Sequence, residues 1–314
     1  AGDWSIRGCF RHSLKGEGFP AGYPDLRNAT NTLLTVSIMF PSAPGPIGVF
    51  DSGYGGLTIL KAIRERLPQY DYIYLGDNAR TPYGTRSFDV VYEFTREAVK
   101  ALFERGCHLV ILACNTASAK ALRSIQMNDL PGWDASRRVL GVICPTVEAL
   151  GSISKNGNIG ILGTPGTISS GTYDIEIAKA FPQFRTVSVA CPMWVPLVEN
   201  KEYDAPGADY FVEKYVEELF EQEPEIDTII LGCTHYPLLI DKIRRQVRDR
   251  AAIITQGELV AASLGDYMRR HPEMDAKCTR GGSCTYLTTE NPDKFTDLAE
   301  TFLNTHLKAG HITL

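Results

Sequence analysis

Short apolar runs alternate with longer stretches of helical period from residue 47 onward, and this alternation constrains the possible fold more than any other feature. Two of the helical stretches are 87–105, opened by Ser87 and closed by Gly106, and 207–222. The apolar runs have the length of buried strands: IGVFD (47–51), YIYLGD (72–77), HLVILA (108–113), VLGVI (139–143), IGIL (159–162), TVSVA (186–190), TIILG (228–232) and AIIT (252–255). Strands that alternate with helices predict an α/β fold with mostly parallel, doubly wound sheets.

The second half of the chain repeats the first. HLVILACNTASA (108–119) resembles DTIILGCTHYPL (227–238), and IGVFDSGYGGL (47–57) resembles IGILGTPGTI (159–168). The two alignments have nearly the same offset along the chain. We therefore expect two similar α/β domains that face each other across a cleft.

Cys114 and Cys233 occupy equivalent positions in the two repeats, each at the end of a strand and before polar residues. Ligands of open α/β sheets bind beyond the carboxyl ends of the strands. One thiolate and one thiol on opposite walls of a cleft can remove a proton from one face of a chiral carbon and return one to the other, which is two-base racemisation. The alternative is that each cysteine is a small buried hydrophobe, as we expect for Cys107, Cys144 and Cys191.

Composition excludes several other classes of protein. Lys and Arg number 32 and Asp and Glu 37, for a net charge of −5, and no basic run marks a nucleic-acid binder. No apolar run approaches the length that spans a bilayer. The eight cysteines lie mostly in or beside apolar runs of a long chain, which indicates a reducing cytoplasm and not a disulfide framework. A small-molecule ligand is the expected partner.

Residues 1–45 differ from the rest, because they have no clear period and many Gly, Pro, Asn and Ser residues. We expect a non-essential tail, with the natural start at Met39.

Five motifs together resemble the cofactor-independent glutamate racemases of bacteria, within the aspartate/glutamate racemase superfamily. They are DSGYGGL (51–57), GDNARTPYG (76–84), ACNTASA (113–119), VPLVEN (195–200) and LGCTHYPL (231–238). The resemblance runs from about Ile47 to about Leu303. It implies interconversion of L- and D-glutamate by direct 1,1-proton transfer, without cofactor or metal, to supply D-glutamate for bacterial peptidoglycan. It also implies a cytoplasmic protein, frequently a homodimer, with no nucleic-acid or membrane partner.

The same resemblance assigns roles to individual residues. The counterpart of Cys233 takes the α-proton of L-glutamate and that of Cys114 the α-proton of D-glutamate, and Asp51, Glu199 and His235 assist proton transfer. The positions implied for substrate binding are Asp51, Ser52, Tyr83, Gly84, Asn115, Thr116, Thr164, Thr167, Thr234 and His235.

The chemistry of these residues agrees with the assignment. The glycines of SGYGG allow backbone N–H groups to approach an anion closely, and the hydroxyl and amide side chains are neutral donors. Three alternatives remain. DSGYGG could bind phosphate, although it lacks the lysine of a P-loop; Cys233 and His235 could hold zinc, although two ligands make no site; and Glu199 could be a surface charge.

The resemblance further assigns 46–140 plus 256–314 to the first domain and 141–255 to the second. Two rival functions are racemisation of aspartate or another small acid, and ligand binding without catalysis, for which paired thiols are not needed. CTRGGSC (278–284) is expected to be a hairpin tip without a catalytic role. ITQG (254–257) departs from the family, in which a serine often precedes the glycine.

Overall fold

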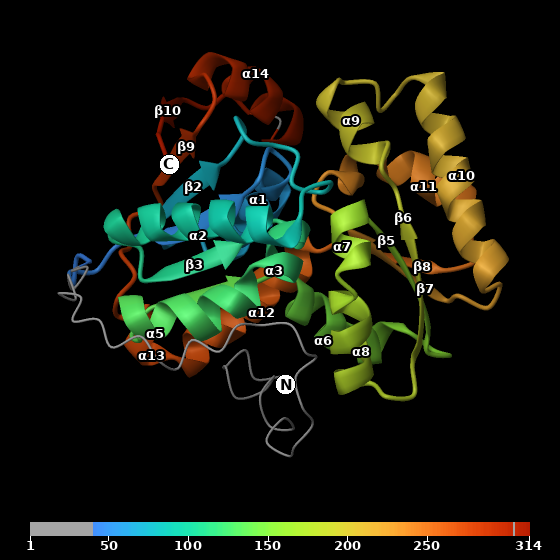
Figure 1. Ribbon diagram of the computed structural model, residues 1–314, viewed down its shortest axis with the longest axis horizontal. Coiled ribbons are helices and arrows are strands. Elements are labelled where there is room, and N and C mark those ends of the chain that lie inside the picture. The colour runs from blue at the N-terminus through green and yellow to red at the C-terminus, as the bar shows by residue number, and fades with distance from the viewer. Residues whose placement is uncertain (1–39, 304) are drawn as a thin grey trace, which may run out of the picture. The chain divides into compact units, whose positions relative to one another are not determined.

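Two parallel sheets organise the part of the chain that the computed structural model describes, which is residues 40–303 and 305–314 (Figure 1). The first sheet has the order β10-β9-β2-β1-β3-β4 and the second the order β6-β5-β7-β8. The strands of the first sheet are β1 (Ile47–Asp51), β2 (Tyr72–Gly76), β3 (Leu109–Leu112), β4 (Arg138–Gly141), β9 (Cys284–Thr288) and β10 (Ala309–His311). Those of the second are β5 (Asn158–Gly163), β6 (Arg185–Ala190), β7 (Thr228–Gly232) and β8 (Ala252–Ile254).

Helices connect successive strands, as the alternating pattern predicts. In the first half they are α1 (Gly56–Arg66), α2 (Phe88–Glu104), α3 (Asn115–Lys120), α4 (Leu122–Ser124), the π-helical η1 (Ile125–Asp129), α5 (Leu130–Trp133) and α6 (Ile143–Ile153). Those that follow are α7 (Pro165–Ser169), α8 (Thr172–Ala180), α9 (Trp194–Glu199), α10 (Pro206–Gln222), the 3₁₀ turn η2 (Tyr236–Leu239), α11 (Ile240–Val247), α12 (Gly257–Arg270), α13 (Pro272–Asp275) and α14 (Pro292–Leu303). None of the described helices is long and apolar enough to cross a membrane.

The ends of α2 illustrate how the local sequence sets a helix. The Ser87 hydroxyl caps the helix by accepting a hydrogen bond from the backbone N–H of Val90. The chain leaves the helix through Gly106, whose φ of +88° suits glycine because it has no Cβ. Helix α2 then lies against β1, β2 and β3, whereas α1 and α12 pack against each other.

The two repeats fold into the same strand order. Strands β2-β1-β3-β4 of the first sheet match β6-β5-β7-β8 of the second, and the repeated segments fall on β1 and β5 and on β3 and β7. The predicted fold class, α/β with two similar parallel sheets, is confirmed. The chain changes sheet between β4 and β5 and returns between β8 and β9. The exact bounds of two domains stay a prediction, because 40–314 form one compact unit.

Strands β9 and β10 extend the first sheet beyond β2, and the sequence did not predict them. The expected hairpin tip at 278–284 is wrong, because Cys284 begins a strand that pairs parallel with β2. Cys278 instead makes an isolated parallel bridge with Gly45. None of the seven cysteines in the described residues forms a disulfide with another of them.

The predicted tail ends earlier than expected. Its first part, with Met39, lies outside the described residues, but Phe40 belongs to the core around β1 and β3. The buried guanidinium of Arg137 donates to the backbone oxygen of Pro41 at 2.6 Å and lies over the Phe40 ring. The segment 40–45 therefore packs with the body of the protein, because it covers a buried cation.

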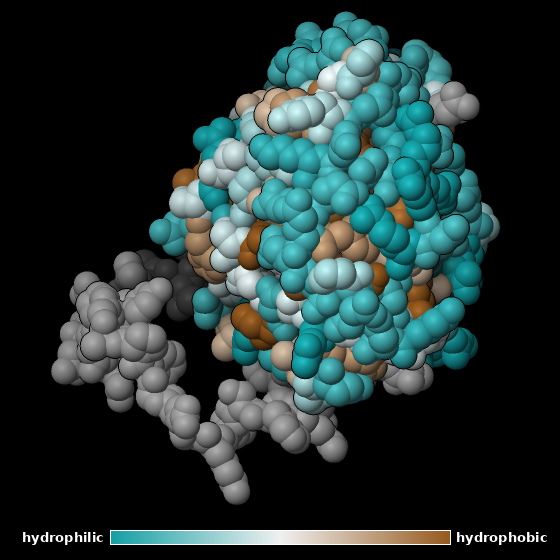
Figure 2. All heavy atoms as spheres, turned by 90° about the vertical axis from the view of Figure 1, so that its right-hand side faces the viewer, coloured by the Kyte–Doolittle hydropathy of each residue, from teal (hydrophilic) through white to brown (hydrophobic). Residues whose placement is uncertain are grey.

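Each sheet has its own apolar core. One core cluster includes Phe50, Leu75 and Val110, and the other includes Ile159, Ile161 and Ile230. The face on the side of α10 is mostly hydrophilic, with apolar residues scattered over it (Figure 2). Scattered apolar residues do not mark an interaction surface, so the functional site is sought at the strand ends.

Candidate active site

A cavity of about 100 Å³ receives residues from the carboxyl ends of strands in both sheets. Cys114 follows β3 of the first sheet and Cys233 follows β7 of the second, and both line this cavity. Their positions agree with the prediction that equivalent thiols lie on one cleft. The other predicted residues that line it are Ser52, Tyr83, Gly84, Asn115, Thr116, Thr164, Glu199, Thr234 and His235.

Cys114 lies at the start of α3 and is 5% exposed. Its sulfur is 3.3 Å from the Ser52 hydroxyl and accepts a hydrogen bond from the backbone N–H of Ala117 at 3.4 Å. Burial and the nearby Asp51 carboxylate raise the pKa of the Cys114 thiol to about 12, although both hydrogen bonds act in the opposite direction. At neutral pH, Cys114 is therefore a thiol that can give up a proton.

Cys233 has a different environment, because a histidine lies next to it. The Cys233 sulfur is 3.9 Å from Nδ1 of His235, and Nε2 of His235 is 3.1 Å from Oε1 of Glu199 at the end of α9. Burial opposes the charged imidazolium, but the interactions with Cys233 and Glu199 outweigh it and raise the pKa of His235 to about 10. At neutral pH a cation therefore lies beside the Cys233 sulfur.

Asp51 ends β1 beneath the cavity and is 1% exposed. Its Oδ2 accepts the backbone N–H of Gly53 at 2.9 Å, while Oδ1 has no hydrogen-bond partner among the described residues. Burial raises the pKa of Asp51, and the positive charge of His235 partly offsets this effect. Asp51 does not line the cavity itself, but its free oxygen can accept a proton.

The glycines of the DSGYGG loop allow the first sheet to meet the residues that follow β7. A Cβ on Gly55 would lie 2.2 Å from Oγ1 of Thr234 and 2.6 Å from Nδ1 of His235. A Cβ on Gly53 would lie 3.5 Å from Oε1 of Glu199. Glycine at 55 is therefore required for close approach, and the structure gives this loop a packing role besides the predicted anion-binding role.

Three threonine hydroxyls join α3 to α7 at the edge of the cavity. Thr116 Oγ1 is 3.0 Å from that of Thr164 and 3.2 Å from that of Thr167. Thr164 also caps α7, by accepting the backbone N–H of Thr167 at 3.2 Å. Thr167 does not line the cavity, so Thr167 is linked to the cavity only by its hydrogen bonds to the hydroxyls of Thr116 and Thr164.

Tyr83 and Gly84 form the wall between β2 and α2. The Tyr83 hydroxyl donates to Asp77, and burial together with that carboxylate raises the pKa of Tyr83. The backbone oxygen of Gly84 accepts the N–H of Gly166 at 2.6 Å, which ties this loop to α7. A Cβ on Gly84 would lie 2.8 Å from Cβ of Thr164, so this contact needs glycine.

The sequence missed several residues of the cavity wall. Cys191, expected to be a buried hydrophobe, is 1% exposed as expected but also lines the cavity. The others are Thr81, Pro82, Thr85, Pro165, Pro192, Val195 and Pro196. VPLVEN and ARTPYG contain most of them, so these two motifs carried a signal beyond the residues singled out.

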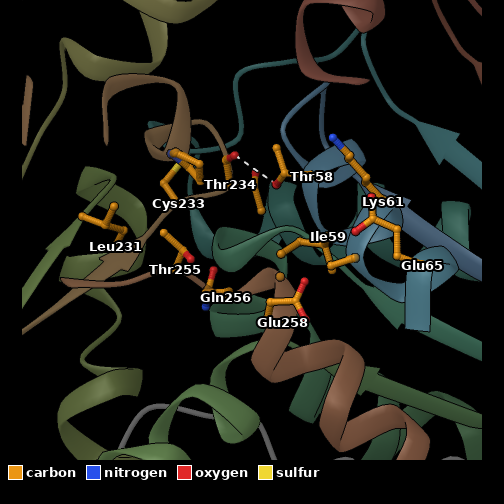
Figure 3. A pocket seen from close by; sticks show the side chains of 13 residues that line it. Thr58, Ile59, Lys61, Glu65, Leu231, Cys233, Thr234, Thr255, Gln256 and Glu258 are labelled. Carbon is orange, nitrogen blue, oxygen red and sulfur yellow. Dashed lines mark hydrogen bonds between the residues drawn. The ribbon is translucent and has the colours of Figure 1, made fainter. Parts of the chain in front are cut away.

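A second cavity of about 210 Å³ lies on another side of Cys233 and Thr234, which line both cavities (Figure 3). The Thr58 hydroxyl, which donates to the backbone oxygen of Gly55 at 2.8 Å, lies 3.5 Å from the backbone oxygen of Thr234 across it. Gln256 and Glu258, from the start of α12, line its opposite side. No group of three or more potential metal ligands occurs among the described residues.

Comparison with known proteins places these features in context. The sequence pattern of the Asp/Glu/Hydantoin racemase family matches residues 57–264. A glutamate racemase of a Ruegeria species is 40% identical over 272 residues, which cover 82% of this chain and 96% of the relative. The glutamate racemase of a Jannaschia species is 41% identical over 273 residues, 82% of this chain and 96% of the relative.

Solved structures agree in fold over most of both chains. A glutamate racemase isoform from Bacillus anthracis has a TM-score of 0.78 at 33% identity, covering 86% of this chain and 98% of that one. The glutamate racemase of Francisella tularensis in complex with D-glutamate has a TM-score of 0.75 at 30% identity, covering 86% and 97%.

Proposed function

Since this chain belongs to the Asp/Glu/Hydantoin racemase family, among relatives that are glutamate racemases, we propose that it interconverts L- and D-glutamate with Cys114 and Cys233 as its two bases. The family predicted from the five motifs is confirmed by these relatives. The observation that carries the mechanism is the pair of thiols, one from each sheet, that line a single cavity.

The environments of the two thiols differ. The imidazolium of His235 lies beside Cys233, whereas burial and Asp51 keep Cys114 protonated, with a pKa of about 12. Cys114 can therefore act as the acid of a two-base transfer in which Cys233 is the base.

The reaction follows from this arrangement. Cys233 takes the α-proton of L-glutamate, the C–H bond breaks, and its electron pair is delocalised into the α-carboxylate. Cys114 then gives its thiol proton to the opposite face of the α-carbon, which forms the new C–H bond of D-glutamate. Cys233 ends as a thiol and Cys114 as a thiolate, so exchange of protons with solvent resets the pair. The reverse reaction begins from that second state.

Neighbouring carboxylates and hydroxyls support these steps. Glu199 holds His235 from the side away from Cys233, and the free Oδ1 of Asp51 can accept a proton near Cys114. Ser52, Thr116 and Thr234 offer hydroxyl donors to the substrate carboxylates at the cavity wall. The mechanism requires neither cofactor nor metal.

The cellular role is part of the same proposal. The protein supplies D-glutamate for peptidoglycan in the bacterial cytoplasm, where free thiols remain reduced, and it works as a homodimer.

Circular dichroism of L-glutamate incubated with the purified protein tests the function, because racemisation removes the signal. Cys114→Ala and Cys233→Ala are each expected to abolish nearly all activity, since either variant leaves one face of the carbon without a base. Cys107→Ala is the matched control, because Cys107 is fully buried but lines neither cavity; it should keep wild-type rates. Substantial activity in either active-site variant would contradict the two-base mechanism.

Rates with aspartate and glutamate decide the substrate. A higher kcat/KM for aspartate would replace glutamate in the proposal. Binding of glutamate without any loss of signal would identify a relative that binds but does not catalyse.

A further inference from the structure

A buried amide pair joins Asn115, next to Cys114, to Gln256, at the start of α12. Nδ2 of Asn115 donates to Oε1 of Gln256 at 2.5 Å, and Nε2 of Gln256 lies 3.1 Å from Oδ1 of Asn115. Both side chains are 3% exposed. The pair connects the end of β3 in the first sheet to the segment after β8 in the second.

Two neighbouring hydroxyls fix which way the amides point. Thr146 donates its hydroxyl hydrogen to the backbone oxygen of Val142 at 2.8 Å, so toward Gln256, at 3.0 Å, it can only accept. The Gln256 side chain must therefore turn its nitrogen to Thr146 and its oxygen to Asn115. Because the Gln256 oxygen faces Asn115, the Asn115 side chain must turn its nitrogen toward Gln256. Thr146 thus sets the orientation of both amides.

Tyr173 supports the same orientation from α8. Its hydroxyl accepts from Nε2 of Gln256 at 2.8 Å and donates to Oδ1 of Asn115 at 2.8 Å. The two hydrogens of Gln256 Nε2 thus go to Thr146 and Tyr173, the Asn115 oxygen accepts from Tyr173, and Gln256 uses one of the two N–H groups of the Asn115 side chain. The other N–H has no partner within the described part of the chain, and Asn115 lines the substrate cavity.

We propose that Gln256 is a positioning residue, which acts through Asn115 by holding one amide N–H of that side chain toward the substrate carboxylates. This inference rests on the proposed function. Gln256 lines the second cavity and not the first (Figure 3), so it does not touch the substrate. A donor held this way contacts the substrate and the transition state alike, so its loss weakens binding uniformly and raises KM more than it lowers kcat.

Gln256→Met tests the proposal, because methionine has a similar size but cannot form the amide pair. We expect KM for both enantiomers to rise about tenfold with kcat within about twofold, as for loss of one hydrogen bond to a charged group. Gln126→Met is the matched control: Gln126 donates to the backbone oxygen of Val139 at 2.8 Å and lines neither cavity. Its KM should equal that of wild type.

A double-mutant cycle shows whether Gln256 acts through Asn115. In the Asn115→Ala background, Gln256→Met should raise KM no further. If the KM increases of the two single variants multiplied in the double variant, the proposal would be overturned. It would also be overturned if Gln256→Met lowered the thermal midpoint but left KM unchanged, because that is the result of a purely structural role.

Thr146→Val gives an independent measurement if Gln256→Met does not fold. It keeps the side-chain shape but removes the acceptor that orients Gln256, so a fraction of Asn115 side chains turns an oxygen toward the cavity and KM rises severalfold. An unchanged KM in this variant would also overturn the proposal. Should wild type fail to racemise glutamate, the proposed function itself fails, and the affinity for D-glutamate in calorimetry replaces KM in every comparison.

Discussion

At the scale of single residues, His235 links the charge of the site to stability. Its pKa rises from 6.5 to about 10 on folding, so between these values the folded protein holds a proton that the unfolded chain releases. The stabilisation is therefore complete below pH 6.5 and is lost as the pH rises through 10. We expect the free energy of unfolding to fall over this window, by at most about 1.4 kcal/mol per pH unit for one proton.

Chemical denaturation of wild type and His235→Asn at a series of pH values measures this effect. In the variant, the free energy of unfolding should fall less steeply with pH, because the contribution of His235 is missing. Equal slopes in the two proteins would show that His235 does not hold the proton.

His235→Asn also tests which base the histidine serves. Loss of general acid–base assistance predicts a decrease in kcat/KM of about a hundredfold or more. The decrease must be the same in both directions, because the two enantiomers have equal free energy in solution. With Cys233 weakened, proton removal from L-glutamate becomes more fully rate-limiting, so the α-deuterium isotope effect should rise for L-glutamate and not for D-glutamate.

Initial rates with protiated and α-deuterated substrate of each hand provide the measurement. Isotope effects that match wild type in both directions would separate His235 from the Cys233 half of the reaction.

At the scale of elements, two helix caps allow stability to be separated from function. Ser87 caps α2 on the surface, whereas Thr164 caps α7 and also lines the cavity. Ser87→Ala and Thr164→Val should each lower the free energy of unfolding by about 1 kcal/mol. Only Thr164→Val should also raise KM, because it breaks the hydroxyl contact with Thr116. Denaturation and steady-state kinetics of both variants check this. If Ser87→Ala and Thr164→Val had the same KM, Thr164 would have no role in substrate binding.

The strands show what a single sequence can reveal about elements. All eight predicted apolar runs are strands, because a buried parallel strand is a continuous apolar run. Strand β9 escaped prediction since its sequence, CTYLT, has no counterpart in the repeat, whereas the equally half-buried β6 belongs to the repeated pattern. β10 is three residues long and mostly exposed.

Prediction of the site from the sequence is limited in the same way. The motifs identified the thiols and hydroxyls, but the amide pair joins residues 141 positions apart in the chain. A separation of that size leaves no local pattern, so only the fold brings Gln256 to Asn115.

At the scale of the whole molecule, the start of the compact unit decides how far the chain can be shortened. Deletion of residues 1–38 should leave activity and thermal midpoint almost unchanged, because that segment has no period that would pack on the core. Deletion of 1–43 should lower the midpoint clearly, because it removes the Phe40 ring over Arg137 and the Pro41 acceptor of its buried guanidinium.

Thermal denaturation of the two truncated proteins, with racemisation rates beside it, makes the comparison. A loss in the shorter deletion would show that 1–38 contributes to the fold, and equal midpoints would show that 40–43 does not.

The matching strand order of the two halves places the two thiols at equivalent strand ends, so that each repeat removes the proton of one enantiomer and returns a proton to form the other. Asp51 and Ser52 surround one sulfur, whereas His235 and Glu199 adjoin the other. A substitution beside one sulfur therefore changes how one proton is removed or returned, while the equal free energies of the two enantiomers require the same change in kcat/KM for both.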